Sequence, residues 1–553
     1  MFHNVKNKQL DLTAIENLSK ELEIPFLLSS MLYSRGIHTM DDAAAFLTSD
    51  YELFDPFLLK DMNRAVDRIE KAIKRKEKIY IVGDFDVDGI TSTSILLRFF
   101  SSIGFPVFNK LPTQKEGHGL STQAVDFVKD NGGHLIITVD NGSTSYDAVN
   151  LALTLNIDVI ITDHHDISKD GVPAAFAVIN PKQETCLSPF KFLSGGGLAL
   201  YLARAIAIRL GYEVNLTPDL FVLAAISTIA DVAPLSRDNR KIVKTGLENF
   251  HQSGITGLNL LLESKRAAAQ YGSRDISFNI APTINAAGKF GFGDDALDLL
   301  TISDYLKVSG TVEKLLKINE DRKELVKVIL PDLMIQAEAA VKKEDLVIVI
   351  KGNHNSAVSG LIASRLTENF QKPVIVISFL DGEETGRASC RSIDGFNMQE
   401  AIEELSEFHL GGGGHYMAAG FALNRDQYDS FVRLINIYAK EHMKVQQKKT
   451  WTIDGEFSIS QMRQKMFSAL QLMEPFGAKN ENALLKIRGI KLKQATYGQW
   501  VSYHCQIENQ NVRVYGNTEP QMGHIPTGKE INAIIEIVFK EGQPIFLLKD
   551  FEE

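Results

Sequence analysis

The chain has 553 residues, which is more than one hydrophobic core usually supports, so its length predicts three or four domains. Hydrophobic residues make up 44% and charged residues 23% of the chain, as in ordinary soluble globular proteins, and no apolar run reaches the roughly 18 residues of a membrane span. The formal net charge of −10 argues against a protein that coats nucleic acid non-specifically, because such proteins neutralise phosphates, but it permits an enzyme with a local basic groove.

The opening segment and the cysteines favour the cytoplasm. The first residues, MFHNVKNKQLDLT, lack the apolar core of a secretory signal. The three cysteines, Cys186, Cys390 and Cys505, lie far apart and in no metal-ligand spacing. This arrangement excludes a disulfide framework and is typical of a protein from a reducing compartment.

Residues 1–75 are expected to be helical and to pack on the core, since Ile24–Leu47 supplies apolar residues at helical spacing. From residue 76 to about 250, short apolar runs suited to buried parallel strands alternate with amphipathic helices, which predicts an α/β domain. The predicted strands are Ile79–Val82, Leu135–Val139, Val159–Thr162 and Ala175–Ile179, and the predicted helices between them are Ile90–Phe100, Thr122–Val128 and Tyr146–Leu155.

A helical connector is predicted over residues 251–340, with Pro331 a kink or break in its last helix. A second α/β domain follows at 341–442, with strands at Leu346–Ile350 and Val374–Ser378 around a helix at Leu361–Phe370. The polar segment Met443–Thr450 is expected to be a linker. Short β-type runs in residues 451–553 then predict a small β-barrel or sandwich.

Three strands of the first α/β domain run directly into acidic segments. Ligands of open α/β sheets bind just beyond the carboxyl ends of the strands, so these segments are expected to meet in one crevice. A fourth candidate, Asp231, follows the apolar run Leu223–Ala230. The acidic segments are Asp84–Asp88 after the first strand, Asp140–Gly142 after the second and Asp163–Asp166 after the third.

Carboxylates that converge raise one another's pKa unless a cation lies among them. Aspartate oxygens with one or two imidazoles suit Mn²⁺ or Mg²⁺ better than Zn²⁺, and two such ions are the usual device for hydrolysing phosphate esters. For any single aspartate the alternative is a helix cap or a turn, which competes at Asp88 and is favoured at Asp166. Clusters at all three strand ends are hard to explain as caps.

These segments resemble the motifs of the DHH phosphoesterase family. Asp163-His164-His165 is the tripeptide that names the family, and Gly83–Thr93, Thr138–Gly142 and Thr228–Leu235 are similar to three of its other motifs. Residues 341–442 resemble the associated DHHA1 domain. Residues 56–69, 178–199 and 281–289 resemble the branch of the family that degrades single-stranded DNA, and Glu474–Ala483 resembles the start of that branch's oligonucleotide-binding barrel. The likeness covers nearly the whole chain.

The resemblance implies a DHH parallel-sheet domain and a DHHA1 α/β domain joined by a long helical linker, followed by an OB-type β-barrel. The implied ligands of two Mn²⁺ or Mg²⁺ ions are Asp84, Asp86, Asp140, His164 and Asp231, with Asp88 also possible and Asp140 the natural bridge. Asp163 and His165 would serve the scissile phosphate and orient His164.

The DHHA1-like half is expected to hold the substrate. A glycine run lets backbone N–H groups approach a phosphate, although such a run is more often a flexible turn, and the planar fork of arginine matches phosphate oxygens. The implied substrate-binding residues are Lys289, Arg387, Arg391, Ser392, Gly412, Gly413, Gly414 and His415. In the barrel, Trp500 and Tyr503 are candidate stacking faces for bases.

Two segments depart from the family pattern. Pro112–Gly119 is PTQKEGHG, where the family has an arginine before an EGYG-like turn, and Thr283 and Lys289 stand where arginines are expected. From the sequence, these differences are expected to leave the metal chemistry untouched and to bear on the selection of a 5′ end.

The function that the resemblance implies is degradation of single-stranded DNA from the 5′ end to mononucleotides, in repair and recombination. A single-strand-binding protein and a helicase would supply the substrate, and no membrane is involved. One alternative is a phosphodiesterase for short oligonucleotides, cyclic dinucleotides or pyrophosphate, but such relatives tend to be shorter and lack the barrel. Another is a non-catalytic replication scaffold, but such proteins lose the carboxylates that this chain retains.

Overall fold

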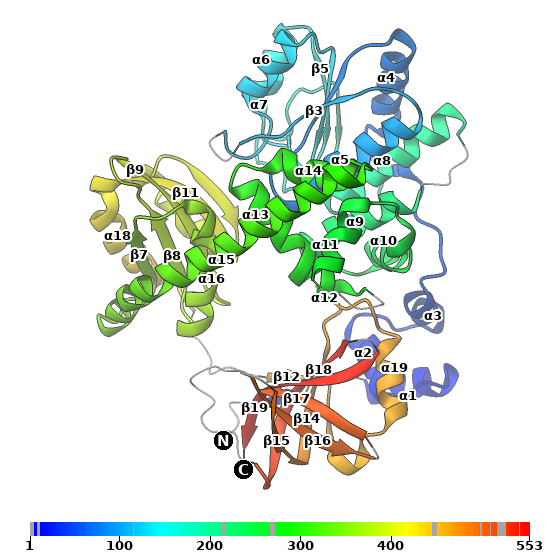
Figure 1. The fold of residues 1–553 in the computed structure, drawn as a ribbon, viewed down its shortest axis with the longest axis vertical. Helices are drawn as coiled ribbons and strands as arrows, with labels where there is room; N and C mark the ends of the chain where they lie inside the picture. The colour runs from blue at the N-terminus through cyan, green and yellow to red at the C-terminus, as the bar shows by residue number, and fades with distance from the viewer. Residues whose placement is uncertain are drawn as a thin grey trace. The chain divides into compact units, whose positions relative to one another are not determined.

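The computed structural model describes residues 5–7, 11–113, 116–212, 217–265, 271–444, 451–497, 500–508, 510–516, 527–540 and 542–552 (Figure 1). The chain divides into two compact units. The first unit comprises residues 1–316 and 452–553, and the second comprises residues 317–451. Among the described helices, none is long and apolar enough to cross a membrane.

A five-stranded parallel sheet forms the centre of the first unit. Its strand order is β3-β2-β4-β5-β6, and β2, β4 and β6 are wholly buried, as their runs of isoleucine and valine predict. The four predicted strands are confirmed, whereas the short edge strand β3 was not predicted. The strands are β2 (Ile79–Val82), β3 (Phe108–Lys110), β4 (Leu135–Val139), β5 (Asp158–Thr162) and β6 (Ala177–Ile179).

Helices cover both faces of this sheet. Apolar side chains of α6 (Thr122–Asp130) and α7 (Tyr146–Thr154) pack against one face, which carries Tyr80, Ile136 and Ile161 (Figure 1). On the other face α5 (Val87–Ser102) packs with α8 (Gly195–Leu210) and α9 (Pro218–Ala230). The unit continues through α10 (Arg237–Glu248), α11 (Thr256–Ser264), α12 (Ser273–Asp275), α13 (Ala281–Lys289) and α14 (Gly293–Thr301).

The C-terminal part of the first unit is a closed sheet. Its strand order is β13-β14-β18-β19-β17-β16-β15, and only Leu492 separates β14 from β15. Strands β14 and β15 stand at opposite ends of the series β14-β18-β19-β17-β16-β15 but are consecutive in the chain. They therefore form one bent strand, which closes the sheet into the predicted barrel. The elements are β13 (Gly455–Ser458), α19 (Gln464–Gln471), β14 (Ala483–Lys491), β15 (Lys493–Tyr497), β16 (Trp500–Ile507), β17 (Gln510–Gly516), β18 (Glu530–Lys540) and β19 (Gln543–Glu552).

Tyr503 is buried within the barrel core, so its prediction as a stacking face is wrong. The pleat of β16 directs its side chain inward, and composition alone does not reveal which residues of a strand face the core. The side chain of Trp500, the other candidate, lies outside the described part of the structure.

The N-terminal helices pack against two different parts of the first unit, the C-terminal barrel and the parallel-sheet domain. Helices α1 (Leu12–Glu21), α2 (Phe26–Ser34) and α3 (Met40–Thr48) share a hydrophobic core with the C-terminal barrel, in which Leu28 and Met31 pack with Phe467 and Leu485. By contrast, α4 (Met62–Arg75) packs against α8 and β6 of the parallel sheet. Helix α4 therefore lies against the parallel-sheet domain, whereas α1–α3 pack mainly on the barrel.

The long helix α15 (Tyr305–Lys342) continues through Pro331, so the predicted break is absent. Pro331 is exposed, and water can satisfy the carbonyl group that loses its intrahelical partner.

The second unit contains a sheet of order β10-β11-β9-β8-β7, in which only β7 and β8 are parallel. Helices α17 and α18 pack on one face of this sheet through Ile402, Phe431 and Ile435, and α16 contacts β8 and β9. The elements are β7 (Ile348–Gly352), α16 (Ser359–Phe370), β8 (Val374–Ser378), β9 (Thr385–Arg391), α17 (Met398–Glu404), β10 (Gly412–His415), β11 (Ala418–Asn424) and α18 (Tyr428–His442).

Candidate active site

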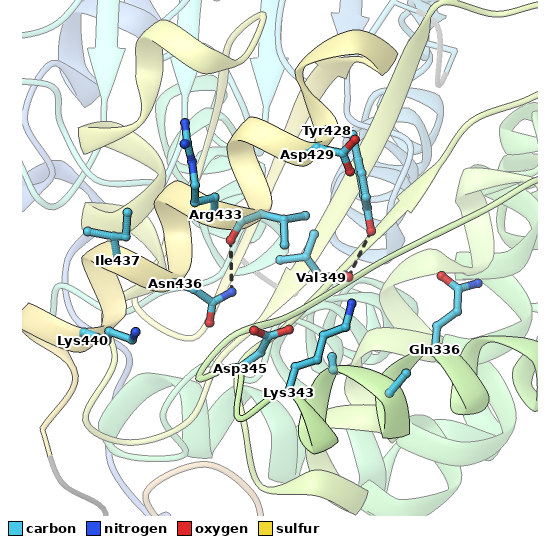
Figure 2. Close-up of a pocket in the computed structure, with 13 residues that line it drawn as sticks. Gln336, Lys343, Asp345, Val349, Tyr428, Asp429, Arg433, Asn436, Ile437 and Lys440 are labelled. Carbon is cyan, nitrogen blue, oxygen red and sulfur yellow. Dashed lines mark hydrogen bonds between the residues drawn. The ribbon is translucent and has the colours of Figure 1, made fainter.

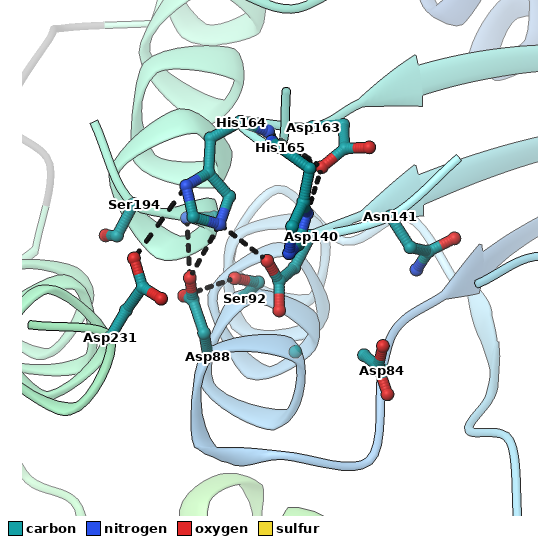
Figure 3. A network of polar contacts seen from close by, with 12 residues as sticks. Asp84, Asp88, Ser92, Asp140, Asn141, Asp163, His164, His165, Ser194 and Asp231 are labelled. Carbon is teal, nitrogen blue, oxygen red and sulfur yellow. Dashed lines mark hydrogen bonds and ion pairs between the residues drawn. The ribbon is translucent and has the colours of Figure 1, made fainter. Parts of the chain in front are cut away.

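The centre of the candidate site is His164, which lies among three carboxylates from three different segments (Figure 3). Its Nε2 is 3.0 Å from Oδ1 of Asp140, directly after β4, and 3.5 Å from Oδ2 of Asp88, in the first turn of α5. Its Nδ1 is 3.7 Å from Oδ2 of Asp231, directly after α9. Four predicted metal ligands therefore converge beyond the carboxyl ends of the strands, as expected for an open α/β sheet.

Asp140 occupies a crowded position with a left-handed backbone (φ 63°), which aspartate tolerates better than most residues. Helix α8 begins against it. A Cβ at Gly195 would lie 2.6 Å from the Cβ of Asp140, and one at Gly196 would lie 2.4 Å from Oγ of Ser227. The glycines of the segment SGGGLA therefore let α8 approach the acidic cluster, a role that the sequence indicated only through resemblance.

Asp163 is buried and organises the DHH tripeptide. Its carboxylate accepts hydrogen bonds from the backbone N–H groups of Ser143 (2.8 Å), His164 (2.8 Å) and His165 (3.1 Å), and from Nδ1 of His165 (2.7 Å). Burial would raise the pKa of Asp163, but these bonds and the nearby imidazoles hold it below its usual value. The bond to Asp163 in turn raises the pKa of His165 to about 9. His165 is therefore cationic at neutral pH.

Asp86, and not Asp88, caps the start of α5. Capping was the alternative considered for Asp88, but Asp86 is the N-cap of α5 and accepts from Gly89 N at 3.0 Å. Asp88 accepts hydrogen bonds at 2.8 and 2.9 Å from two backbone N–H groups at the N-terminus of α8, and another from Ser227. Because Oδ2 of Asp88 also lies 3.5 Å from Nε2 of His164, Asp88 both binds the N-terminus of α8 and belongs to the acidic cluster.

Asp84 lies apart from Asp88 and Asp231 in the cluster (Figure 3). Its carboxylate accepts from Phe85 N at 2.6 Å, and its Oδ2 is 2.9 Å from Nδ1 of His118. Sequence analysis did not identify His118 as a site residue. The available signal was the sequence EGHG, which places an imidazole where the family's EGYG-like turn has a tyrosine.

The carboxylates repel one another strongly. Burial, followed by the charges of Asp88, Asp86 and Asp84, raises the pKa of Asp140 well above its usual value. Burial and the same kind of repulsion raise the pKa of Asp231 to about 8 and that of Asp86 to about 6. A divalent cation among these groups would relieve the repulsion. Carboxylate oxygens with imidazole nitrogens are a donor set that suits Mn²⁺ or Mg²⁺, so the residues present fit these ions.

Lys289 ends α13, and its charge acts on His118. The preceding glycine allows a close approach, because a Cβ at Gly288 would lie 1.7 Å from the carbonyl oxygen of Phe85. Lys289 therefore lies beside the Asp84 side of the site, while its predicted contact with substrate stays a prediction.

Three of the predicted substrate-binding residues of the second unit, Arg387, Arg391 and His415, lie on one face of its sheet. Arg387 and Arg391 lie four residues apart in β9 and so share a face. Arg391 pairs with Ala418 of β11, and Ala418 pairs with His415 of β10, which places His415 on the same face. Ala418 and Gly420 of β11 lie between the positions of these side chains on the same face. We call the face that carries Arg387, Arg391, His415, Ala418 and Gly420 the basic sheet face.

Arg391 is fixed within the second unit. Its Nε donates to Oγ of Ser364 in α16 at 3.2 Å, and its Nη1 donates to the carbonyl of Cys390 at 2.7 Å. Burial lowers the pKa of Arg391. The guanidinium is thus oriented by the protein before any ligand binds.

The glycine run differs from the flexible turn considered as its alternative. Gly412, Gly413 and Gly414 form the edge strand β10, which is paired on one side with β11. A Cβ at Gly412 would lie 2.4 Å from that of Phe421, whereas one at Gly413 would meet no atom within 4 Å. Close packing therefore explains Gly412, and open space lies over Gly413.

Ser392 is buried, and its hydroxyl donates to the carbonyl of Phe396 at 2.7 Å. Its proton is already used within the protein. A direct role for this side chain in binding substrate stays a prediction.

A cavity of about 510 Å³ in the second unit lies elsewhere, between the end of α15 and α18 (Figure 2). Lys343, Arg433 and Lys440 line it together with Asp345 and Asp429. It contains none of the predicted site residues.

Comparisons with known proteins agree with this geometry. Residues 78–228 match the model of the DHH family, N-terminal domain, and residues 343–441 match that of the DHHA1 domain. The single-stranded-DNA-specific exonuclease RecJ of Dickeya dadantii is 32% identical over 478 residues, which are 82% of each chain. RecJ of Bacillus subtilis is 33% identical over 492 residues, which are 86% of this chain but 61% of that relative.

The crystal structure of RecJ from Thermus thermophilus in complex with Mn²⁺ matches with a TM-score of 0.84 and 26% identity, covering all of this chain and 79% of the other. The same protein in complex with Mg²⁺ gives a TM-score of 0.78 at 25% identity, covering all of this chain and 78% of the other. With the acidic cluster at the expected sheet edge and these matches in both α/β domains, the chain belongs to the RecJ family of DHH phosphoesterases.

Proposed function

We propose that this protein is a metal-dependent exonuclease that hydrolyses single-stranded DNA from its 5′ end and releases mononucleotides. The observation that carries the proposal is the convergence of Asp88, Asp140 and Asp231 on His164, in a chain of this family. Hydrolysis is the chemistry that such a cluster suits best, because its carboxylates are held close enough together to require divalent cations.

Two positions for Mn²⁺ or Mg²⁺ are proposed. Asp88, His164 and Asp231 would hold one ion at the first position, Asp84 and Asp86 would hold the other at the second, and Asp140, which lies beside His164, would contribute to this metal site. When bound, the ions would activate the attacking water and stabilise charge on the attacking and leaving oxygens.

The protein's own residues would then orient the phosphodiester. Asp163 accepts the Nδ1–H of His165 and keeps that imidazole protonated, which leaves Nε2 as a charge-assisted donor for a non-bridging phosphate oxygen. The basic sheet face of the second unit, where Arg391 is already oriented, would bind phosphates of the strand. The C-terminal barrel would add an accessory grip on longer strands.

Two alternatives fit less well. A phosphodiesterase for short oligonucleotides or cyclic dinucleotides has no need of the closed C-terminal sheet. A non-catalytic scaffold has no need of the carboxylates that this chain retains around His164.

The test uses purified full-length protein and end-labelled single strands in Mn²⁺ or Mg²⁺. We expect release of mononucleotides, loss of activity with EDTA, protection by a block at the 5′ end and digestion past a block at the 3′ end. Asp140→Ala and His164→Ala should each abolish hydrolysis. The matched control is Asp166→Ala, because Asp166 is 74% exposed and paired with Lys182. Full activity of Asp140→Ala would refute the site, and digestion only from the 3′ end would refute the polarity.

A role in DNA repair and recombination, and a supply of strands by a single-strand-binding protein and a helicase, are further parts of the proposal that rest on family membership alone. A cytoplasmic location is supported by Cys186, Cys390 and Cys505, all of which are buried free thiols.

A further inference from the structure

The loop before α6 brings the imidazole of His118 to the side of the acidic cluster that carries Asp84. Nδ1 of His118 lies 2.9 Å from Oδ2 of Asp84. Its ring packs on Phe85, with ring centroids 4.4 Å apart. The contact with Phe85 places His118 against the same backbone segment that carries Asp84 and Asp86.

The spacing of these two atoms is that of a hydrogen bond, and it is also compatible with two neighbouring ligands on one ion. Two donors at about 2.1 Å from a metal and at right angles to each other lie about 3 Å apart. His164 and Asp140, both predicted ligands, have their nearest donor atoms 3.0 Å apart. The His118–Asp84 pair reproduces this geometry at the second position.

The predicted ligands of the second position other than His118, namely Asp84, Asp86 and Asp140, offer carboxylate oxygens. Mg²⁺ prefers oxygen ligands in near-ideal octahedral geometry and keeps several waters, whereas affinity for nitrogen donors rises through the transition metals, beginning with Mn²⁺. An imidazole at this position therefore favours Mn²⁺ over Mg²⁺.

We propose that His118 is a nitrogen ligand of the ion at the Asp84 position, and that it makes this position selective for Mn²⁺ over Mg²⁺. The inference rests on the metal site within the proposed function but on neither the substrate nor the polarity. A tyrosine at this position, as in the family's EGYG-like turn, has no nitrogen donor, so the ion at the Asp84 position would lack a nitrogen ligand from this residue.

The test is calorimetric titration of metal-free full-length protein with Mn²⁺ and, separately, with Mg²⁺, in the absence of DNA. The variants are His118→Ala and His118→Tyr. His38→Ala is the matched control, because His38 is an exposed imidazole that stacks on Tyr33 in the N-terminal helices. For both His118 variants we expect Mn²⁺ affinity at one of two sites to fall by about 10- to 100-fold, and Mg²⁺ affinity to change by less than about threefold.

Pulsed electron paramagnetic resonance of the Mn²⁺-loaded protein, with ¹⁵N-labelled histidine, provides a second readout. The wild type should show one more directly bound imidazole than His118→Ala, and His38→Ala should match the wild type. Equal losses of Mn²⁺ and Mg²⁺ affinity would mean that His118 only orients Asp84 and would overturn the proposal. An unchanged nitrogen signal, or no Mn²⁺ binding to the wild type, would overturn it as well. Because no nuclease assay is involved, failure here is distinct from failure of the proposed polarity or substrate.

Discussion

Arg240 joins three parts of the first unit that are distant in sequence, and its replacement should destabilise all three. It is fully buried in α10, and its guanidinium donates to the carbonyl of Phe46 (2.7 Å) at the end of α3. It also donates to the carbonyls of Met473 (3.0 Å) and Glu474 (2.7 Å), just beyond α19. The guanidinium packs over the ring of Phe46 at 3.8 Å from its centroid.

Arg240→Met keeps the apolar length of the side chain and removes every donor. All three carbonyls lose the bond that Arg240 donates, but Met473 keeps a second hydrogen bond, from Asn480 (2.7 Å), so the carbonyls of Phe46 and Glu474 are affected most. A buried group left without a partner costs about 1–3 kcal/mol. Two such groups, partly offset by the apolar methionine, predict a loss of about 3 kcal/mol in the free energy of unfolding.

The assay is urea unfolding followed by circular dichroism, together with hydrogen exchange of residues 472–480. Arg209→Met provides the matched control, because Arg209 forms a surface ion pair with Asp67 and such pairs contribute about 0–1 kcal/mol. If Arg240→Met lay within about 0.5 kcal/mol of the wild type, and exchange of the 472–480 backbone were unchanged, the guanidinium would not hold these segments together.

Three further outcomes are expected. Gly195→Ala should lower Mn²⁺ affinity at least about tenfold by displacing Asp140, whereas Gly197→Ala, whose nearest contacts would be 3.4 Å away, should retain it; calorimetry distinguishes the two. Metal-free protein should lose stability as pH rises from about 4 to 8. In this range Asp231, whose pKa is raised from 3.8 to about 8, keeps its proton in the folded state, whereas the unfolded chain has lost it. Saturating Mn²⁺ should reverse this trend in thermal melts. Arg391→Lys should raise KM for single-stranded DNA about tenfold with little change in kcat, since lysine lacks the planar fork, and equal effects on both parameters would contradict a binding role.

The parallel sheet and most of the acidic cluster could be predicted from sequence because both follow from local patterns. Buried strands are continuous apolar runs, and the residues after parallel strands share one edge of the sheet. Those two rules alone bring Asp140 and His164 together. They do not give the roles of individual carboxylates, because Asp88 takes its partners from the N-terminus of α8, more than 100 residues away in sequence.

His118 illustrates a second limit. A lone histidine in a polar loop has no periodicity or spacing that marks it as a ligand. Its importance emerges only when Phe85 and Asp84 are seen beside it. The edge strand β3 was missed for a related reason, since three residues with mixed exposure carry too short a pattern to recognise.

The contact between the chain's two ends has a consequence for how the barrel's function can be tested. Because Leu28 and Met31 of α2 share a core with barrel residues such as Phe467, deletion of residues 451–553 would expose apolar side chains of the N-terminal helices. The segment after Asp231 would also lose its backbone bond from Leu235 N to the carbonyl of Ala478 (2.8 Å). A truncated protein would therefore lose activity whether or not the barrel touches DNA. An accessory grip must instead be tested by substitutions on the barrel surface that leave this shared core intact.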